Sequence, residues 1–249
     1  MKSFSFDSQE QSAIIWLSIA FTILLIFWHL FGEEISALII LTHAIFFFAA
    51  MLVAVFLHEV GHKLAAKQIG YRARTIRFTG GLIASIILAF YTFARIPIIT
   101  PNLLALDADP RKRLDRRRTY DNPTQQAIIA ASGVLGSLIA ITLMRALAVL
   151  TGYELFITAQ FGAALHAVYS LIPFELLAII KLKFVNNLKP ITPSDGLYII
   201  RASYLAWGSI FSFTVFFAVL SFIPGVATLL LAIGLMVVTV FAYKHLLKK

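Results

Sequence analysis

The sequence has no cysteine and few charged residues. None of its 249 residues is cysteine, and only 13% are Asp, Glu, Lys or Arg. Without cysteine there are no disulfides or thiolate ligands, so a metal ion would have to be held by histidine and carboxylate. The scarcity of charge, together with 60% hydrophobic residues and a mean hydropathy of +0.88, excludes an ordinary water-soluble domain. We therefore expect a membrane protein.

Long apolar stretches predict the fold class. A helix needs about 20 apolar residues to cross a bilayer. Stretches near or above this length occupy about residues 12–31, 35–66, 126–150, 157–180, 197–222 and 226–245. We predict an all-α polytopic membrane protein with about six transmembrane helices. Residues 1–249 should form a single membrane-embedded domain, without a separate soluble domain.

The region between the second and third predicted spans has a different character. Residues 71–81 combine arginines, β-branched residues and a closing glycine pair, which predicts a short strand or hairpin at the membrane interface. Residues 82–95 are apolar but too short for a clear span, so we expect a re-entrant or interfacial segment. Residues 102–125 contain the run RKRLDRRR and should form an aqueous loop.

Basic residues predict the orientation, because lysine and arginine near span ends accumulate on the cytoplasmic side. With six spans and both termini in the cytoplasm, the outer loops contain Glu33, Glu34 and Glu154 but no lysine or arginine. Arg145 lies near the outer end of a span, and we expect its side chain to reach the interface. We predict a multi-pass protein of the cell membrane. Its arginine run should contact anionic lipid, not nucleic acid.

An HExxH motif lies in the second predicted span. His58 and His62 should project from one helix face, about 6 Å apart along the axis, a spacing that suits one zinc ion. Glu59 follows the first histidine and can lie beside the ion without binding it. The alternative is that both histidines only pack between helices. Ionisable groups within a span are costly, so three together favour a functional site.

A catalytic zinc usually has three protein ligands, so a third is needed from elsewhere in the chain. The longer HExxHxxGxxH motif is absent, because Ala65 and Gln68 stand at its last two positions. Asp195 is the leading candidate, since it lies in the sequence PSDG at the start of a predicted span. The predicted topology places it at the depth of the two histidines. Its alternative role is that of a helix N-cap.

These motifs together resemble the site-2 protease family. Members of that family combine HExxH in one span with N-x-x-P and D-G elements around a later span. This chain has HEVGH at residues 58–62, SLIP at 170–173 and DG at 195–196. The resemblance covers a catalytic core of about residues 50–205. The small residues at 131–137 are also similar to those of a core helix in that family, although helix packing alone explains them.

The resemblance implies a ligand set and an activity. It implies one Zn²⁺ per chain, held by His58, His62 and Asp195, with Glu59 as general base. The chain would then be an intramembrane zinc metalloendopeptidase. Its substrates would be membrane proteins with a transmembrane helix, cut in or near that helix close to the cytoplasmic face. The predicted strand at residues 71–81 could receive an unwound substrate by edge pairing.

The chain departs from the family pattern at two places. Ser170 stands where the family has asparagine, so its hydroxyl would replace only in part a substrate or oxyanion contact. Pro173 and Asp195 are separated by an insertion at 174–193, which makes Glu175 a rival third ligand. Glu154 is a further acidic alternative. The competing functions are a different membrane HExxH peptidase that uses such a glutamate, a non-catalytic zinc-binding membrane scaffold, and a solute carrier.

The remaining histidines are assigned supporting roles. His166 lies one turn before Ser170, where it could line the cavity, pack, or support a metal ligand by a hydrogen bond. His43 lies about 22 Å from His58 along the same predicted helix, too far to share an ion. We expect His43 to be a packed polar residue. No cofactor other than zinc is indicated.

Overall fold

A computed structural model describes residues 5–30, 36–92, 95, 97–108, 122–173, 193–223, 230, 233–234 and 237. Its helices are α1 (Ser8–His29), α2 (Ala37–Ile69), α3 (Thr79–Thr92), α4 (Pro123–Thr151), α5 (Leu155–Ser170), α7 (Asp195–Ala202) and α8 (Tyr204–Phe222). Its strands are β1 (Tyr71–Ile76) and β2 (Leu103–Ala108). In this part of the chain, four helices are long and apolar enough to cross a membrane: α1, α2, α4 and α8. The predicted all-α membrane fold is confirmed.

Local chemistry sets the ends of the long helices. Asp7 and Glu10 form a reciprocal capping box at the start of α1, and Asn122 caps α4 just before Pro123. Gly70 and Gly152 end α2 and α4 with φ of 92° and 70°. Glycine adopts this left-handed conformation without the steric cost that a Cβ would add. Helices α2 and α4 therefore stop where the sequence supplies a glycine.

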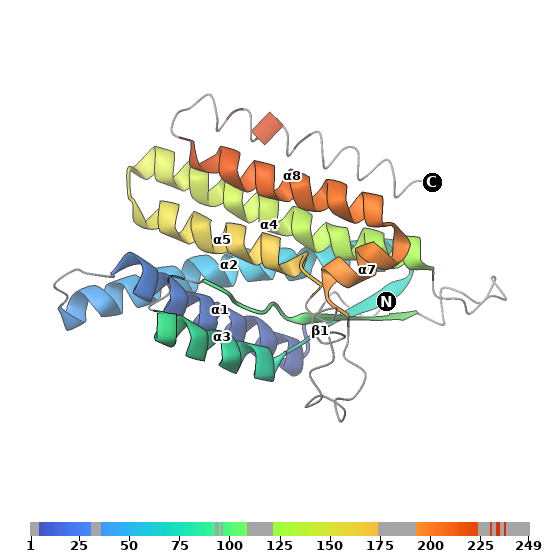
Figure 1. The fold of residues 1–249 in the computed structure, drawn as a ribbon, viewed down its shortest axis with the longest axis horizontal. Coiled ribbons are helices and arrows are strands. Elements are labelled where there is room, and N and C mark those ends of the chain that lie inside the picture. Colours follow the sequence, from blue (N-terminus) through green and yellow to red (C-terminus); the bar gives the residue numbers. More distant parts are fainter. Residues whose placement is uncertain are drawn as a thin grey trace.

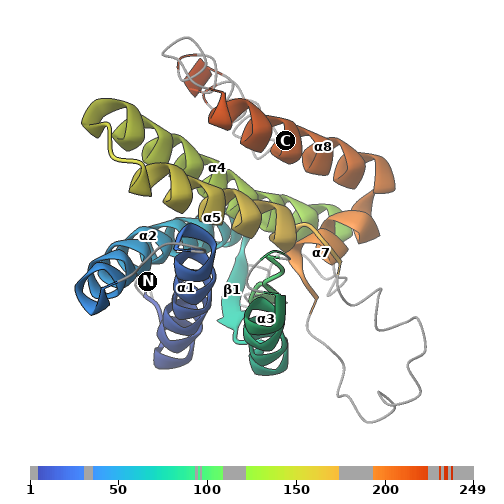
Figure 2. The ribbon, with the colours of Figure 1, turned by 60° about the vertical axis from the view of Figure 1, so that its left-hand side comes forward.

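Helices α2 and α4 lie against each other through the middle of the molecule (Figure 1). Helix α1 packs on α2, α3 lies beside α1, and α8 lies over α4 on the opposite side (Figure 2). The core between these helices is apolar and includes the fully buried side chains Phe21, Phe47, Met51, Ile141 and Phe217. Because α2 and α4 contact most of the other helices, side chains on their shared face are removed from lipid.

The small sheet pairs β1 with β2 in antiparallel register, from Tyr71 opposite Ala108 to Ile76 opposite Leu103. The strand predicted at 71–81 is confirmed, but the alternative of a local hairpin is wrong. The glycine pair at 80–81 lies in the first turn of α3, not in a hairpin turn. The partner strand comes from the segment expected to be an aqueous loop. Within that segment, residues 109–121 lie outside the described part.

Two predicted spans end or break earlier than their apolar sequence suggests. The segment 197–222 is divided at Ser203, which is extended (φ −166°, ψ 125°) and whose hydroxyl caps Ala206 N. Helix α5 stops at Ser170, consistent with the restriction that Pro173 places on the residue before it. The apolar segment 82–95 is helical as α3 up to Thr92. The predicted span at 226–245 lies almost wholly outside the described residues.

The side chain of Arg145 is buried among the helices, and the expectation that it reaches the interface stays a prediction. This side chain is 6% exposed, and Nη2 donates to the carbonyl oxygen of Ile223 at 3.0 Å. Ile223 directly follows the last residue of α8. The guanidinium therefore bonds the end of α8 to α4, which is why it stays within the helix bundle.

Candidate metal centre

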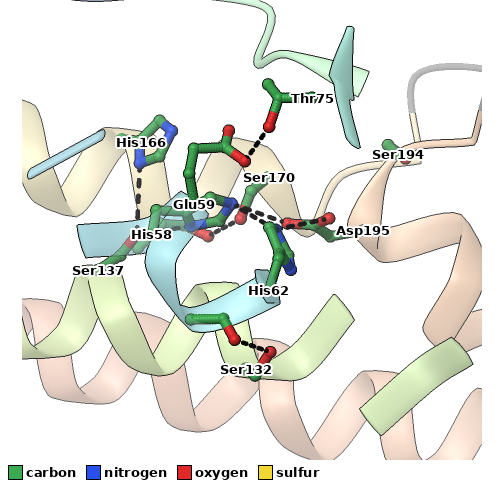
Figure 3. Close-up of polar contacts among 12 residues, drawn as sticks. His58, Glu59, His62, Thr75, Ser132, Ser137, His166, Ser170, Ser194 and Asp195 are labelled. Carbon is green, nitrogen blue, oxygen red and sulfur yellow. Dashed lines mark hydrogen bonds and ion pairs between the residues drawn. The ribbon is translucent and has the colours of Figure 1, made fainter. Parts of the chain in front are cut away.

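The HExxH motif lies in the second half of α2, on the face that meets α4. His58, Glu59 and His62 are 4%, 4% and 2% exposed. The first residue of α7, Asp195, is 5% exposed and points toward the two imidazoles (Figure 3). Charged and polar groups buried to this degree need partners. His58, His62 and Asp195 contact one another, and Glu59 contacts Thr75. The structure therefore brings the predicted ligands and base together from two helices.

The donor atoms converge closely enough for one ion. His58 Nε2 lies 3.0 Å from His62 Nε2 and 3.0 Å from Asp195 Oδ2. His62 Nε2 lies 3.3 Å from Asp195 Oδ1. Among the described residues, this trio is the group of three donors that could hold a metal ion.

The spacing and chemistry of these donors fit zinc. Ligand atoms at 2.0–2.2 Å from a tetrahedral ion lie about 3.3–3.6 Å from one another. Two of the observed separations, at 3.0 Å, fall just short of this range, and the third, at 3.3 Å, lies at its lower limit. The donors would have to part by only a few tenths of an ångström. Two imidazoles and one carboxylate leave a fourth position open, as in catalytic zinc sites.

Both histidines are held so that Nε2 faces the donor group. His62 Nδ1 lies 2.8 Å from the carbonyl oxygen of Ile129, which can only accept, so Nδ1 carries the proton. His58 Nδ1 lies 2.9 Å from Ser137 Oγ. Both partners belong to α4. The carbonyl contact selects the tautomer of His62 in which Nε2 has a lone pair free for an ion. Both contacts set the ring orientation that a metal ligand needs.

His166 lies beside the ligands but outside the donor group. Ser137 Oγ lies 3.3 Å from His166 Nδ1, so this hydroxyl joins His166 to His58. The rings of His58 and His166 meet at 4.6 Å between centroids, and Phe21 packs edge-on against His166 at 5.7 Å. This position suits the predicted support of a metal ligand, which stays a prediction.

Two glycines make room for the site. A Cβ on Gly133 of α4 would collide with the imidazole of His62. A Cβ on Gly196 of α7 would collide with the carbonyl of Leu171, which directly follows α5. Close approach of α4 and α7 to their neighbours therefore depends on residues without side chains, as expected where helices pack tightly in a membrane.

Asp195 is not the helix cap that was its alternative role. The N-cap of α7 is Ser194, whose hydroxyl accepts a hydrogen bond from Leu197 N at 3.4 Å. The carboxylate of Asp195 is directed to the histidines instead. Glu154 precedes His166 by twelve positions on or beside α5, about 18 Å along the axis, so it cannot reach the site. Glu175 lies outside the described residues.

Ser170 is the last residue of α5, and Pro173 follows three residues later. The hydroxyl of Ser170 is buried and donates to the carbonyl of Ala167 in its own helix at 2.9 Å. Pro173 is partly buried after the helix end. These contacts do not decide the substrate or oxyanion role, which stays a prediction for both residues.

Sequence reasoning missed Thr75 and the contact made by Ser137. The Thr75 hydroxyl on β1 donates to Glu59 Oε2 (Figure 3). Side chains alternate along β1, and Tyr71, Ala73 and Thr75 are buried. A prediction that the odd-numbered residues of this strand face inward would have indicated Thr75. Ser137 was grouped with residues that serve packing. Its hydrogen bonds follow from helix register, which sequence alone does not show.

Comparison with known proteins identifies one family. The model of peptidase family M50 matches residues 46–233, well over half of the 249 residues. Comparison with curated proteins and with solved structures finds no match. The matched range includes the three donors and Glu59, and both strands of the sheet.

Proposed function

Because the chain belongs to peptidase family M50, the family of the site-2 proteases, we propose that it is an intramembrane zinc metalloprotease. Its substrates are membrane proteins, cut in or near a transmembrane helix. The observation that carries this proposal is the convergence of His58 and His62, on a helix long enough to span a membrane, with Asp195 at the start of α7 and with Glu59 one residue after His58.

One Zn²⁺ per chain fits the donor set. His58, His62 and Asp195 would hold it, and cysteine, the usual ligand of structural zinc, is absent from the sequence. When bound, zinc supplies a Lewis acid that polarises the scissile carbonyl and makes water a better nucleophile at neutral pH. The buried hydrogen bonds of the two histidines orient Nε2 before any ion arrives, so little reorganisation is needed on binding.

Glu59 is the proposed general base. Its carboxylate is buried and precedes His62 by less than one helical turn, so it lies near the ligands without belonging to the donor group. There it accepts a proton from the attacking water and delivers that proton to the leaving amide nitrogen. The new C–O bond forms first, the C–N bond breaks when the nitrogen has taken up that proton, and the products are a carboxylate and an amine.

The substrate has to present an extended segment, because a peptide bond inside a helix is shielded by its own turn. The two-stranded sheet lies beside α2, and a substrate strand could add to its edge. The side chains of Arg72 and Arg74 on β1 are exposed, whereas Ala73 and Thr75 are buried. Edge pairing at β1 would place a substrate backbone near Glu59, because Thr75 of β1 contacts Glu59. The pairing would have to use backbone groups other than Thr75 N–H, which contacts Glu10.

The distribution of basic residues supports placing the site near the cytoplasmic face of the cell membrane, with both termini in the cytoplasm. Reporter fusions to each terminus and within the predicted loop at 102–125 test this topology. Cytoplasmic signals from all three positions are expected. An external signal from the loop would contradict it.

The decisive experiment uses the purified full-length chain in lipid nanodiscs with a panel of single-span membrane proteins. We expect cleavage that a zinc chelator stops and added Zn²⁺ restores, with no cleavage by Glu59→Gln. If the chain binds Zn²⁺ but the substrates look the same after incubation with wild type and with Glu59→Gln, the result would contradict proteolysis and favour a zinc-binding scaffold.

A further inference from the structure

The carboxylate of Glu59 receives a hydrogen bond from the sheet. Thr75 Oγ1 on β1 donates to Glu59 Oε2, and the two side chains are 5% and 4% exposed. An ionised carboxylate can only accept, so the hydroxyl proton lies between the two oxygens. The strand thus contacts the proposed base directly.

This contact differs from those of the other buried threonines. In the described part of the chain these are Thr22, Thr142 and Thr214, and each donates to the carbonyl four residues earlier in its own helix. Such bonds satisfy the hydroxyl within its own helix and do not connect one helix or strand to another. Thr75 instead joins β1 to α2, at the one carboxylate that the proposed mechanism requires to act as a base.

The backbone of Thr75 is held from outside the sheet. Its N–H lies 3.4 Å from Glu10 Oε1 of α1, and the buried Glu10 forms an ion pair with the partly buried Lys63 of α2 at 2.8 Å. Lys63 directly follows His62. The position of Thr75 is therefore fixed by a charged network that returns to the metal-site helix, and not by strand pairing alone.

The opposite edge of the sheet is held as well. Leu104 pairs with Thr75, and Leu104 N donates to the carbonyl of Pro193 at 3.2 Å. In an antiparallel ladder the N–H groups of alternate pairs point away from the partner strand, which explains why both find partners outside the sheet. Pro193 lies two residues before Asp195. The pair of Thr75 and Leu104 thus connects the segment before Asp195 with the residue that contacts Glu59.

We propose that Thr75 is a positioning residue for Glu59, an inference that rests on the proposed function. The terminal torsion of a glutamate is soft, so a buried carboxylate without a donor can rotate. The hydroxyl holds Oε2 toward the strand and leaves Oε1 to accept the proton from water. Without this bond, the carboxylate turns toward the donor group and competes with water for the open ligand position.

The test compares Thr75→Val, which keeps the shape of the side chain, with Thr75→Ser, which keeps the hydroxyl. The kinetics use the single-span substrate that wild type cleaves fastest. We expect Thr75→Val to lower kcat by about 10- to 100-fold with KM within twofold and unchanged zinc stoichiometry. Thr75→Ser should recover most of the loss. The matched control is Thr214→Val on α8, which removes a buried hydroxyl away from the site and should keep wild-type kinetics.

Three results would overturn the assignment: a kcat of Thr75→Val within twofold of wild type, a loss of zinc in parallel with activity, or a Thr75→Ser variant as impaired as Thr75→Val. Each of these would mean that the hydroxyl does not orient the base.

A second measurement separates this inference from the proposed function, because it needs neither metal nor activity. In metal-free protein, Thr75→Val should lower Tm by about 2–4 °C when Glu59 is present, and by less than half of that in a Glu59→Ala background. Additive shifts would refute the contact. Coupled shifts in a chain that cleaves nothing would keep the contact and refute the protease.

Discussion

The two halves of α2 lie in different surroundings. In the first half, Leu38, Leu41 and Ile45 are 56–70% exposed on a surface suited to lipid. In the second half, His58, Glu59 and His62 are buried against α4 and β1. Both halves are continuous helix without a proline, so the difference is not one of backbone. It lies in what packs against each turn.

A pair of histidines shows what that packing does. His43 Nδ1 bonds the carbonyl of Ile39 in its own helix at 2.8 Å, and its ring lies beside His29 at 5.1 Å between centroids. His62 Nδ1 bonds the carbonyl of Ile129 in α4 at 2.8 Å. A local bond satisfies the ring but leaves it free to move with one helix. A bond to a second helix fixes the ring relative to that helix. Since α4 also packs against α7, the ring of His62 is held in place relative to Asp195.

The largest effect is expected from removing the base while keeping the ligands. Glu59→Gln retains the three donors, so zinc content should equal that of wild type, but cleavage should fall by about 10²- to 10⁴-fold or below detection. Metal analysis and single-turnover cleavage of a single-span substrate measure both quantities. Activity near that of wild type would show that the second half of α2 does not contain the base.

The second largest effect is expected from changing Asp195, the donor that comes from α7 and not from α2. Asp195→Asn replaces a carboxylate by a poorer zinc donor, so zinc affinity should fall by more than about 100-fold and proteolysis with it. Competition with a chromophoric chelator gives the affinity. The matched control is Glu175→Ala, which should keep metal and most activity. Normal zinc binding in Asp195→Asn with loss in Glu175→Ala would move the third ligand to Glu175.

A smaller effect is expected where α4 orients the ligands. Ser137→Ala removes the partner of His58 Nδ1 and the link to His166, so zinc affinity should fall by about 10- to 100-fold while the ligand set stays intact. Ser18→Ala on α1 is the control, since that buried hydroxyl bonds only its own helix among the described residues. Equal zinc affinity in both variants would mean that the contact between helices is not needed for orientation.

The smallest effect should come from the first half of α2. His43→Leu removes an imidazole that bonds its own helix, so zinc affinity and cleavage should stay within about twofold of wild type. The same chelator competition and cleavage assays apply. A loss of zinc in this variant would break the distinction between the two halves, because it would connect the lipid-facing turns to the metal centre.

The metal-site residues were within reach of the sequence, whereas their supporting contacts were not. His58 and His62 share a face because of helix geometry alone, and Asp195 follows from topology and the family resemblance. Thr75 and Ser137 depend on how β1, α2 and α4 meet. The break at Ser203 was missed because apolar residues continue on both sides of it. The hairpin was misjudged because a glycine pair can start a helix as well as close a turn.

The position of Asp195 on α7 also governs when the site can exist. A ribosome makes the chain from its N-terminus, and α2 with its histidines is complete long before residue 195 of 249. Until α7 inserts beside α2, the two imidazoles lack their carboxylate, and the chain in the translocation machinery has no complete metal centre. A partly synthesised chain that ends before α7 therefore contains two of the three donors, and the candidate site can form only after α7 has been made.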